Sequence, residues 1–587
     1  MTEMKEEALL EPNKVYSELK DVVHQNAVQY FDDLVKNSNT DEEANTKLCA
    51  SYYAKLSELE EAKKKASSSR SLTIFLIVVS VLSLVISLLL FFSSVQSGDF
   101  RVVPFLFALL LLALGIVCIV LINTKVKHAQ QAHDARVAEL DTEAKKIRAE
   151  IDPMVASLMS SFTWGMPQSV IRKSAPLIQL DSYLDVKKYD YMVQKYGLQN
   201  NGDPHSSIFT LLSGSIQGNP FFLERRFNQT DGMKTYSNSI TIHWTTWRQD
   251  SKGHSYPVSH SETLTASVTK PCPYYGFDTY LVYCNDAAPN LCFSRQPTVD
   301  KNANEKQIAK QVRRDDKRMD KLAEQDMNDD DPNTNFTEMS NTEFESLFHA
   351  WDRNDEVEFR LLFTPLAQNN MTSLLKRKEP YGDDFSFTKT HRINVIRSEH
   401  AQHLDFEADP ARFYGFDIKA MRETFCEYTD TLFRSLFFDI APLISIPLYQ
   451  QMKPIEYIYK DIYPSNVSFY EHEVAANGFR QEAFKPANAV TPCILKASFD
   501  NKQGEFDDVS VRAYAFRTVS HTEIFTKMGG DGSLHNIPVT WLEYIPVSKV
   551  TKMQVRHLPL SLPEYRKQNG NPDFTRNFRN EIEALLR

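Results

Sequence analysis

Three histidines and an aspartate lie close together in the sequence and could act as metal ligands. They are His391, His400, His403 and Asp405. Imidazole nitrogens and a carboxylate form a ligand set that zinc or iron accepts. If these four side chains converged on one ion, the site could support hydrolysis.

A second possible ligand set consists of cysteines. Cys272, Cys284 and Cys292 could supply thiolates, but their spacings of 12 and 8 residues match no zinc pattern. The sequence therefore favours structural histidines and reduced, buried cysteines over a metal site. The full set of seven cysteines is odd in number and irregularly spaced, which is typical of a reducing compartment.

Two short motifs resemble parts of catalytic sites but lack an essential residue. The run at 214–218, GSIQG, is similar to a nucleophile elbow, but Ser215 is one place early and lies in a strand pattern, where small residues permit close packing. His472-Glu473 matches half of a zinc-peptidase helix, but Ala476 stands where the second histidine should be. We expect no catalytic role at either place.

Nucleotide and calcium sites are also not supported. A P-loop requires a Gly-Lys dipeptide, and this chain contains none. The acidic run at 329–335 alternates like a calcium loop, but Thr334 and Ser340 occupy the places of the required glycine and glutamate. The sequence thus predicts no catalytic, cofactor-binding or metal-binding residue, and we expect the protein not to be an enzyme.

Two uncharged apolar segments dominate the organisation of the chain. Residues 72–92 and 102–122 contain no charged side chain. As helices, each would extend about 31 Å, which matches the hydrocarbon core of a bilayer. Two core helices of a soluble domain are the alternative, but two such segments in tandem favour a transmembrane hairpin.

Positive charges near the two segments predict the orientation in the membrane. Lys63, Lys64, Lys65 and Arg70 precede the first segment, and Lys125 and Lys127 follow the second, whereas the loop between them offers only Arg101 beside Asp99. Lys and Arg near a span tend to remain in the cytoplasm. We therefore expect both termini, and everything after residue 123, on the cytoplasmic side of the inner (plasma) membrane.

Small residues within the apolar segments predict how the two helices meet. Ser80, Ser83 and Ser87 follow one helical face, and Gly115 lies in the second segment, so the hairpin can pack closely against itself. Neither segment holds an ionisable residue, which argues against a proton relay or an ion-coupled transporter.

The remaining sequence predicts a multidomain membrane protein, with an α-helical hairpin or coiled coil and two transmembrane helices ahead of α+β and antiparallel β cytosolic domains. Amphipathic helices are expected at 13–36 and from Thr40 into the membrane, and a 3/4-spaced seam from 130 to 158 indicates a stalk that ends near Asp152-Pro153. The seam fits either an intrachain three-helix bundle, which we favour, or contacts between subunits.

Period-two patterns and breaks set the other boundaries. Strands are expected at 207–217, 221–228, 238–250, 257–270, 509–525 and 537–544, a strand pair at 385–397, an extended segment at 356–363, and helices at 342–350 and 417–441. The predicted regions are 1–70, an N-terminal cytosolic helical hairpin; 71–123, the transmembrane hairpin; 124–163, the helical stalk; 164–299, an antiparallel β domain; 300–340, a charged helix and linker; 341–451, an α+β domain; 452–563, a C-terminal β-rich domain; and 564–587, a basic tail.

One stretch resembles a family. Phe344 and Phe348, then Asp355, then the run 358–365 (EFRLLFTP) are similar to a signature of uncharacterised bacterial two-span membrane proteins, which reads Phe-x-x-x-Phe, an Asp and Ala-Arg-x-Leu-Leu-Thr-Pro. The resemblance covers about 110 residues and departs at Phe359 and in the large β region before the signature. It implies two spans ahead of a cytosolic domain, and it implies no catalytic residues.

Composition narrows the expected partners. The net charge of −10, with acidic residues spread along the chain, predicts no nucleic acid binding. We expect a lipid bilayer, further copies of the chain and other membrane or cytosolic proteins as partners. The leading hypothesis is a non-enzymatic, homo-oligomeric, membrane-anchored cytosolic scaffold or assembly protein of a bacterium. The alternatives are a subunit of a membrane channel or export complex, and a hydrolase whose site is not visible in the sequence.

Overall fold

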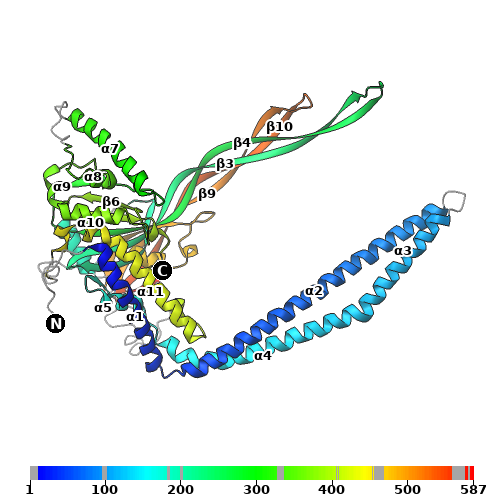
Figure 1. Cartoon of the computed structure of the whole chain (residues 1–587), viewed down its shortest axis with the longest axis horizontal. Coiled ribbons are helices and arrows are strands. Elements are labelled where there is room, and N and C mark those ends of the chain that lie inside the picture. Colours follow the sequence, from blue (N-terminus) through cyan, green and yellow to red (C-terminus); the bar gives the residue numbers. More distant parts are fainter. Residues whose placement is uncertain are drawn as a thin grey trace. The chain divides into compact units, whose positions relative to one another are not determined.

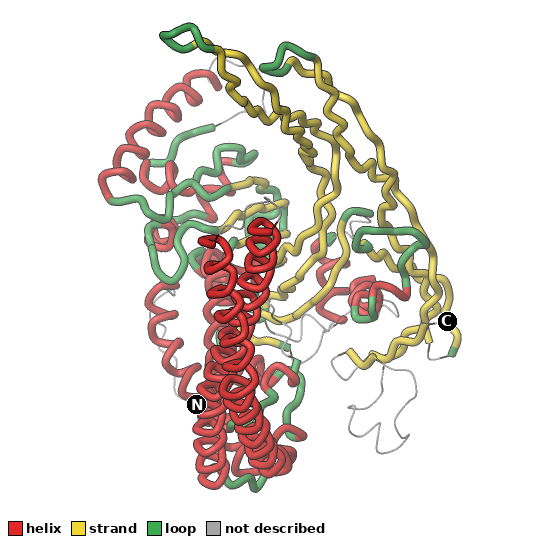
Figure 2. Tube along the Cα trace, turned by 90° about the vertical axis from the view of Figure 1, so that its right-hand side faces the viewer, coloured by secondary structure: helices red, strands yellow, loops and turns green. Residues whose placement is uncertain are grey.

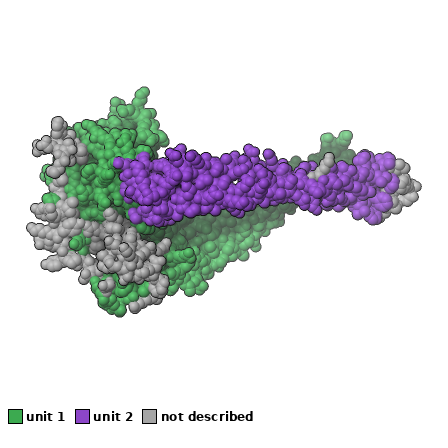
Figure 3. Space-filling view, turned by 90° about the horizontal axis from the view of Figure 1, so that it is seen from below, with its two compact units in different colours: residues 1–27, 164–409, 427–587 green, residues 28–163, 410–426 purple. Residues whose placement is uncertain are grey.

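The computed structural model describes residues 11–95, 102–181, 186–198, 203–326, 336–404, 406, 409–451, 454, 469–504, 506–557, 576–578 and 582–586. Most of the loop between the apolar segments, the acidic run at 329–335, Asp405 and most of the predicted basic tail lie outside these residues. The described chain divides into two compact units (Figure 3). Unit 1 comprises 1–27, 164–409 and 427–587, and unit 2 comprises 28–163 and 410–426.

Unit 2 is built from long helices, as the sequence predicts (Figure 1). Helix α2 runs without interruption through the charged stretch before the first apolar segment, as expected. It begins one residue after Asp41, whose carboxylate accepts the N–H of Ala44 at 3.0 Å, so Asp41 rather than Thr40 caps it. The helices are the second part of α1 (Pro12–Asn37), which belongs to unit 1 up to Ala27, then α2 (Glu42–Val95), α3 (Val102–Leu121), a π-helical turn (Ile122–Val126) and α4 (Lys127–Ser160).

The apolar parts of α2 and α3 pack through small residues, which confirms the predicted role of the serine face. Ser87 Oγ donates to the carbonyl of Ala108 at 2.7 Å, and Ser80 Oγ donates to that of Gly115 at 3.4 Å. A Cβ at Gly115 would lie 2.9 Å from Ser83 Oγ, closer than real Cβ atoms pack. Both helices are long and apolar enough to cross a membrane.

Helix α4 packs back on α2 within the same chain. Lys55 pairs with Glu143 at 3.2 Å and Arg70 with Asp134 at 2.9 Å, while the predicted seam forms the less exposed side of α4. The predicted break at Asp152-Pro153 is wrong, because α4 continues to Ser160. Pro153 lies on the exposed side of the helix, where water can bond the carbonyl that its missing N–H leaves free, and buried neighbours hold the turn together.

The segment 410–426 completes unit 2. Asn45 Nδ2 donates to the carbonyl of Phe416 at 2.8 Å, and the guanidinium of Arg148 lies 3.8 Å from the centre of the Phe416 ring. Arg422 pairs with Asp32 at 2.9 Å and also with Glu42. These contacts tie α1, α2 and α4 to the start of α11 (Ile418–Ile444).

Unit 1 contains a seven-stranded antiparallel sheet in the order β1-β2-β3-β4-β7-β6-β5. Its strands come from both 164–299 and 341–451, so these two predicted domains share one sheet, joined where β4 pairs with β7. The two predicted strands at 221–228 and 238–250 form one continuous strand, β3. The strands are β1 (Ile178–Leu180), β2 (Ser206–Ile216), β3 (Asn219–Gln249), β4 (Ser255–Cys284), β5 (Cys292–Arg295), β6 (Phe385–Thr390) and β7 (Ile393–Ser398).

A second antiparallel sheet has the order β11-β12-β10-β9-β8. The predicted basic tail at 564–587 contributes two strands where the structure describes it. The strands are β8 (Ile494–Gln503), β9 (Phe506–Met528), β10 (Leu534–His557), β11 (Arg576–Phe578) and β12 (Ile582–Leu586).

Strand pairs β3–β4 and β9–β10 extend far beyond their sheets as two long ribbons that run side by side (Figures 1 and 2). The ribbons pack face to face through a small core of Ile242, Leu264, Ala266, Ile537 and Val539. Polar contacts join them as well: Asn238 Nδ2 donates to the carbonyl of Pro538 at 2.7 Å. Each ribbon thus covers one face of the other and leaves its second face exposed.

Helices cover the body of unit 1, whose main core includes residues from α1, α5, the sheet and α8 to α11. The segment predicted as extended at 356–363 is instead helical, because Asp355 caps its first turn and Phe359 and Leu362 fall on one buried face. Helix α11 extends to Ile444, past Pro442 and past the predicted end at residue 441. The helices are α5 (Met166–Ser174), α6 (Val186–Tyr196), α7 (Glu305–Asp326), α8 (Thr342–Phe348), α9 (Glu356–Leu362), α10 (Pro365–Leu375), α11 from residue 427 onward and α13 (Phe469–Asn477), with 3-10 turns at His400–His403, Pro447–Gln450 and Gln481–Ala483. A further 3-10 turn, Pro410–Phe413, belongs to unit 2.

Candidate functional site

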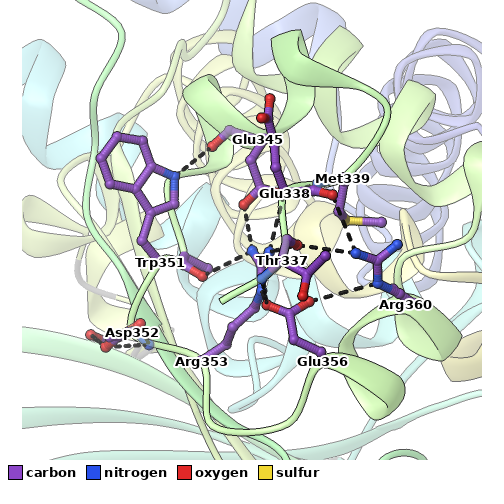
Figure 4. A network of polar contacts seen from close by, with 11 residues as sticks. Thr337, Glu338, Met339, Glu345, Trp351, Asp352, Arg353, Glu356 and Arg360 are labelled. Atoms are coloured by element: carbon purple, nitrogen blue, oxygen red, sulfur yellow. Dashed lines mark hydrogen bonds and ion pairs between the residues drawn. The ribbon is translucent and has the colours of Figure 1, made fainter. Parts of the chain in front are cut away.

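The densest polar network in the signature region surrounds Arg353 (Figure 4). The side chain of Arg353 is fully buried and pairs with Glu345 and, through Nε at 2.7 Å, with Glu356. Its remaining N–H groups reach the carbonyls of Ala350 at 3.3 Å and Thr337 at 3.0 Å. The guanidinium is therefore enclosed by protein acceptors and offers no open position to a substrate.

Glu345 is the main counter-charge in this network. Burial raises the pKa of Glu345, and the charge of Arg353 opposes that rise. Glu345 Oε2 also accepts the backbone N–H of Met339 at 3.3 Å, and Arg360 adds a bond to the carbonyl of Thr337 at 3.1 Å. The network fastens the chain at 337–339 to α8 and α9, which is a structural rather than a catalytic arrangement.

The aromatic positions of the signature form one cluster in the core. Phe363 lies 4.8 Å from Phe348, 4.7 Å from Phe359 and 5.3 Å from Phe344, measured between ring centres. Phe293 of β5 joins them at 5.9 Å from Phe363. The phenylalanines of the signature thus have a packing role.

The polar positions of the signature are helix caps and a loop anchor. Asp355 accepts the N–H of Glu358 and caps α9, and Thr364 caps α10 ahead of Pro365 at its first position. Glu358 accepts the backbone N–H groups of Asn290 and Leu291 at 2.8 and 2.9 Å. Each of these bonds holds a helix end or the loop at 290–291 in place.

His400 is a buried imidazole that lies between two carboxylates. Its Nδ1 lies 2.7 Å from Asp384, and its Nε2 lies 3.4 Å from Asp439 and 3.2 Å from the carbonyl of Ser435. Tyr381 stacks on the ring at 3.9 Å. Burial alone would lower the pKa of His400, but Asp439 and Asp384 outweigh it and raise that pKa to about 10.

This environment makes His400 a permanently charged structural group near neutral pH. Because its pKa is higher in the folded protein than the ordinary value of 6.5, the imidazolium stabilises the fold fully below about pH 6.5 and loses that effect as the pH rises through 10. We expect the melting temperature of the wild type to fall relative to that of His400→Gln between pH 6.5 and pH 10. A constant difference, measured by calorimetry of the detergent-solubilised full chain, would contradict this.

The histidines and aspartate considered as possible metal ligands are not brought together by the residues that the structure describes. His391 is exposed in the turn before β7, and His400 follows that strand, so about 20 Å of extended chain separates them. The side chain of His403 and Asp405 lie outside the described residues. Within the described ranges, no group of three or more His, Cys, Asp or Glu side chains could hold a metal ion.

The cysteine set is also separated. Cys272 and Cys284 lie on the same strand, β4, and twelve extended residues place them about 40 Å apart. The structure instead brings together one residue from each of the two candidate ligand sets: Cys292 Sγ lies 3.9 Å from His391 Nδ1. The sequence contains no signal for this pairing, because it depends on β5 lying beside β6.

Cys292 differs from the other cysteines in its exposure. Six of the seven are buried, and Cys292 alone is partly exposed. Since a maleimide must reach the sulfur, we expect the folded chain to take up one label and the denatured chain seven. Mass spectrometry of labelled protein measures this, and Cys292→Ser should reduce labelling of the folded chain to zero. Labelling of Cys426 or Cys493 in the folded chain would contradict the structure.

The remaining sequence candidates have packing roles. Glu473 on α13 is buried and binds the N–H of Ile208 at 3.0 Å and the ammonium of Lys496 at 2.6 Å, and burial raises its pKa to about 7. It therefore clamps α13 to β2 and β8. A Cβ at Gly214 would lie 2.6 Å from the carbonyl oxygen of Gln179, which confirms close packing in place of a nucleophile elbow.

Comparisons with family models, with curated proteins and with solved structures give no match to this chain. The family resemblance of the signature region therefore stays a prediction.

Proposed function

We propose that the protein is a membrane-anchored, homo-oligomeric scaffold whose unit 1 lies in the cytosol of a bacterial cell. The main observation that supports this proposal is the pair of long ribbons in unit 1. Strands β3 and β4 are 31 and 30 residues long, and β9 and β10 are 23 and 24, far longer than their pairing within the two sheets requires. Strands of about five or six residues suffice for an ordinary sheet.

The ribbons provide surface rather than enclosure. Their shared core holds them together, while the outer face of β3–β4 exposes serine and threonine side chains such as Thr241 and Thr263, whose hydroxyls lie 3.1 Å apart. An extended, stiff surface of this kind suits a protein that positions other chains.

The apolar helices support the membrane anchor. Phe75 on α2 and Leu110 on α3 are 63% and 65% exposed, and large apolar side chains are exposed along both helices. Such continuous exposed apolar surface requires a cover, and the length of each helix fits a bilayer. The flanking lysines at 63–65 and at 127 would lie near anionic headgroups.

An extraction experiment tests the anchor. We expect the full chain to stay in the membrane pellet after alkaline carbonate treatment. Leu110→Arg places a charge in the apolar segment, at a cost of about 2.5–3.5 kcal/mol, and should release much of the protein. Leu361→Arg is the matched control, because Leu361 is 57% exposed on α9 of unit 1, and this variant should stay in the pellet. Release of the wild type would contradict the anchor.

A mass measurement tests the homo-oligomer. We expect the full chain in lipid nanodiscs to contain more than one copy by mass photometry across a wide range of protein concentrations. A strict monomer at every concentration would contradict the scaffold proposal.

The channel alternative predicts that a bulky residue in place of Ser83 abolishes conductance, but this substitution would not report on a pore alone. Ser83 is buried in the contact between α2 and α3, where its Oγ bonds the carbonyl of Ser80 at 2.9 Å. Enlarging it would disturb the packing of the hairpin whether or not a pore exists.

A further inference from the structure

The long ribbons leave free strand edges, and these edges are not equivalent. Beyond Asn228, β3 has β4 as its only neighbouring strand in the described chain, and β4 has only β3 until it meets β7 at Leu281. An unpaired edge presents backbone N–H and C=O groups that can add a strand from another chain.

Prolines show which residues of β4 direct their backbone N–H and C=O groups to its free edge. In an antiparallel pair, opposite residues either exchange both hydrogen bonds or direct both groups outward. A proline has no N–H to give, so it fits a ladder only at an outward position. Pro257, Pro271 and Pro273 all have odd numbers, so the odd-numbered residues of β4 point outward.

The register then assigns the outward residues of β3. Pro257 lies opposite Trp247 and Pro271 lies opposite Met233. The odd-numbered residues of β3 therefore also direct their backbone N–H and C=O groups to the free edge, away from β4. Gln229 confirms this direction, since its N–H bonds the carbonyl of His205 at 2.8 Å, on the side away from β4. Seven outward residues then follow on β3, all exposed: Thr235, Ser237, Ser239, Thr241, His243, Thr245 and Trp247.

The β3 edge from 235 to 247 lacks the features that protect an edge. Its sequence, TYSNSITIHWTTW, contains no proline, no glycine and no Asp, Glu, Lys or Arg, and is rich in residues that favour strands. Among these outward groups, only the N–H of Ser239 has a partner, the side chain of Asn238 at 2.8 Å. Its neighbour β4 is interrupted by Pro257 and Pro271, and its Thr265 carbonyl already accepts the ammonium of Lys527.

The second ribbon does not offer an equivalent edge. Strand β10 carries Pro538 and Pro546. Strand β9 has no proline, but a two-fold pairing of its free edge around Thr522 would place Arg517 opposite Lys527 of the other copy, and like charges directly opposite are unfavourable. The uncharged β3 edge can meet its own copy without such repulsion.

We propose that two copies of this chain associate by pairing their β3 edges, antiparallel and about a two-fold axis near Thr241. The pairing joins two ribbons into one four-stranded layer with up to about 14 new backbone hydrogen bonds. It continues the exposed serine and threonine face across both copies. The inference rests on the proposed function, because it names the interface that a homo-oligomeric scaffold requires.

A pair of matched proline variants tests the interface. Thr241 and Thr263 are the same residue type, lie opposite each other and both point outward, one on each edge of the ribbon. Thr241→Pro removes an N–H from the proposed interface, and Thr263→Pro removes one from the other edge. We expect Thr241→Pro to weaken self-association of the full chain in nanodiscs at least tenfold, and Thr263→Pro to leave it unchanged.

Disulfide trapping keeps the test decisive if a proline disturbs the ribbon. Opposite Cα atoms in an antiparallel pair lie about 4.5–5.5 Å apart, within reach of a disulfide. With diamide as the oxidant, Thr241→Cys should form a covalent dimer, and Thr263→Cys and the wild type should not. Equal trapping at both positions, equal weakening by both prolines or unchanged association of Thr241→Pro would overturn the β3 interface.

The outcomes also separate this inference from the proposed function. If the full chain is an oligomer whose association does not depend on Thr241, the scaffold proposal stands and the β3 interface is ruled out. If the wild type is a monomer, both the interface and the homo-oligomer are ruled out. Carbonate extraction tests the membrane anchor independently of both.

Discussion

Arg353→Ala is expected to lower the free energy of unfolding of unit 1 by about 3–5 kcal/mol. The variant leaves the carboxylate of Glu345, which is 1% exposed, without its buried partner and empties the space between the aromatic rings of Phe336 and Phe359. Urea denaturation of the detergent-solubilised full chain, followed by tryptophan fluorescence, measures the change. Trp351 is a suitable reporter because its indole N–H bonds the carbonyl of Glu345 at 3.2 Å.

The control for this prediction is Arg360→Ala. Arg360 also bonds the carbonyl of Thr337, but its side chain is 43% exposed, and we expect a loss of only about 0–1 kcal/mol. Adding Glu345→Gln to Arg353→Ala should restore part of the stability, because it removes the unpaired charge. Similar losses from Arg353→Ala and Arg360→Ala would show that the buried network is not what holds this region.

Phe363→Ala alone is expected to lower the free energy of unfolding of unit 1 by about 3–5 kcal/mol, measured by the same urea denaturation. The ring is fully buried among four other phenylalanine rings, including Phe348 and Phe359, and its removal leaves a cavity that their packing cannot readily fill.

Leu361→Ala provides the comparison for this variant within the same short segment. Leu361 is 57% exposed, so its truncation should change the free energy of unfolding by about 0.5 kcal/mol or less. A Phe363→Ala variant as stable as Leu361→Ala would mean that the signature region is not a packing motif.

Patterns that repeat along the chain made the largest elements predictable. The two uncharged segments predict the apolar parts of α2 and α3, and the serine face at Ser80, Ser83 and Ser87 predicts the contact between them. The period-two alternation predicts strands where the ribbons form. Each of these features is local, so the sequence alone carries it.

Features that depend on distant residues were not predictable. The strand β7 pairs with β4 more than a hundred residues earlier in the chain, and this pairing merges two predicted domains into one sheet. The sequence predicts an extended segment where the short helix α9 forms, because the apolar residues there fit either period and the Asp355 cap decides for the helix. The buried pair of Arg295 with Asp383 at 2.7 Å has no sequence signal at all.

In the candidate site, too, local features are predictable from the sequence and contacts between distant residues are not. The polar and aromatic residues of the signature were identified as a group, but their roles as caps, anchors and core rings follow only from their contacts. The pairing of His400 with Asp384 and Asp439 joins a 3-10 turn, the end of a loop and α11, which no spacing rule brings together.

The sidedness of the chain is the central claim, and thiol labelling of intact cells tests it most directly. Cys292 is the suitable reporter for unit 1 because Cys426 and Cys493 are buried in the fold. A membrane-impermeant maleimide should leave Cys292 unlabelled in intact cells and label it after permeabilisation, while Ser97→Cys in the predicted external loop should be labelled without permeabilisation. Labelling of Cys292 in intact cells, or protection of Ser97→Cys there, would contradict a two-span anchor with its large unit in the cytosol.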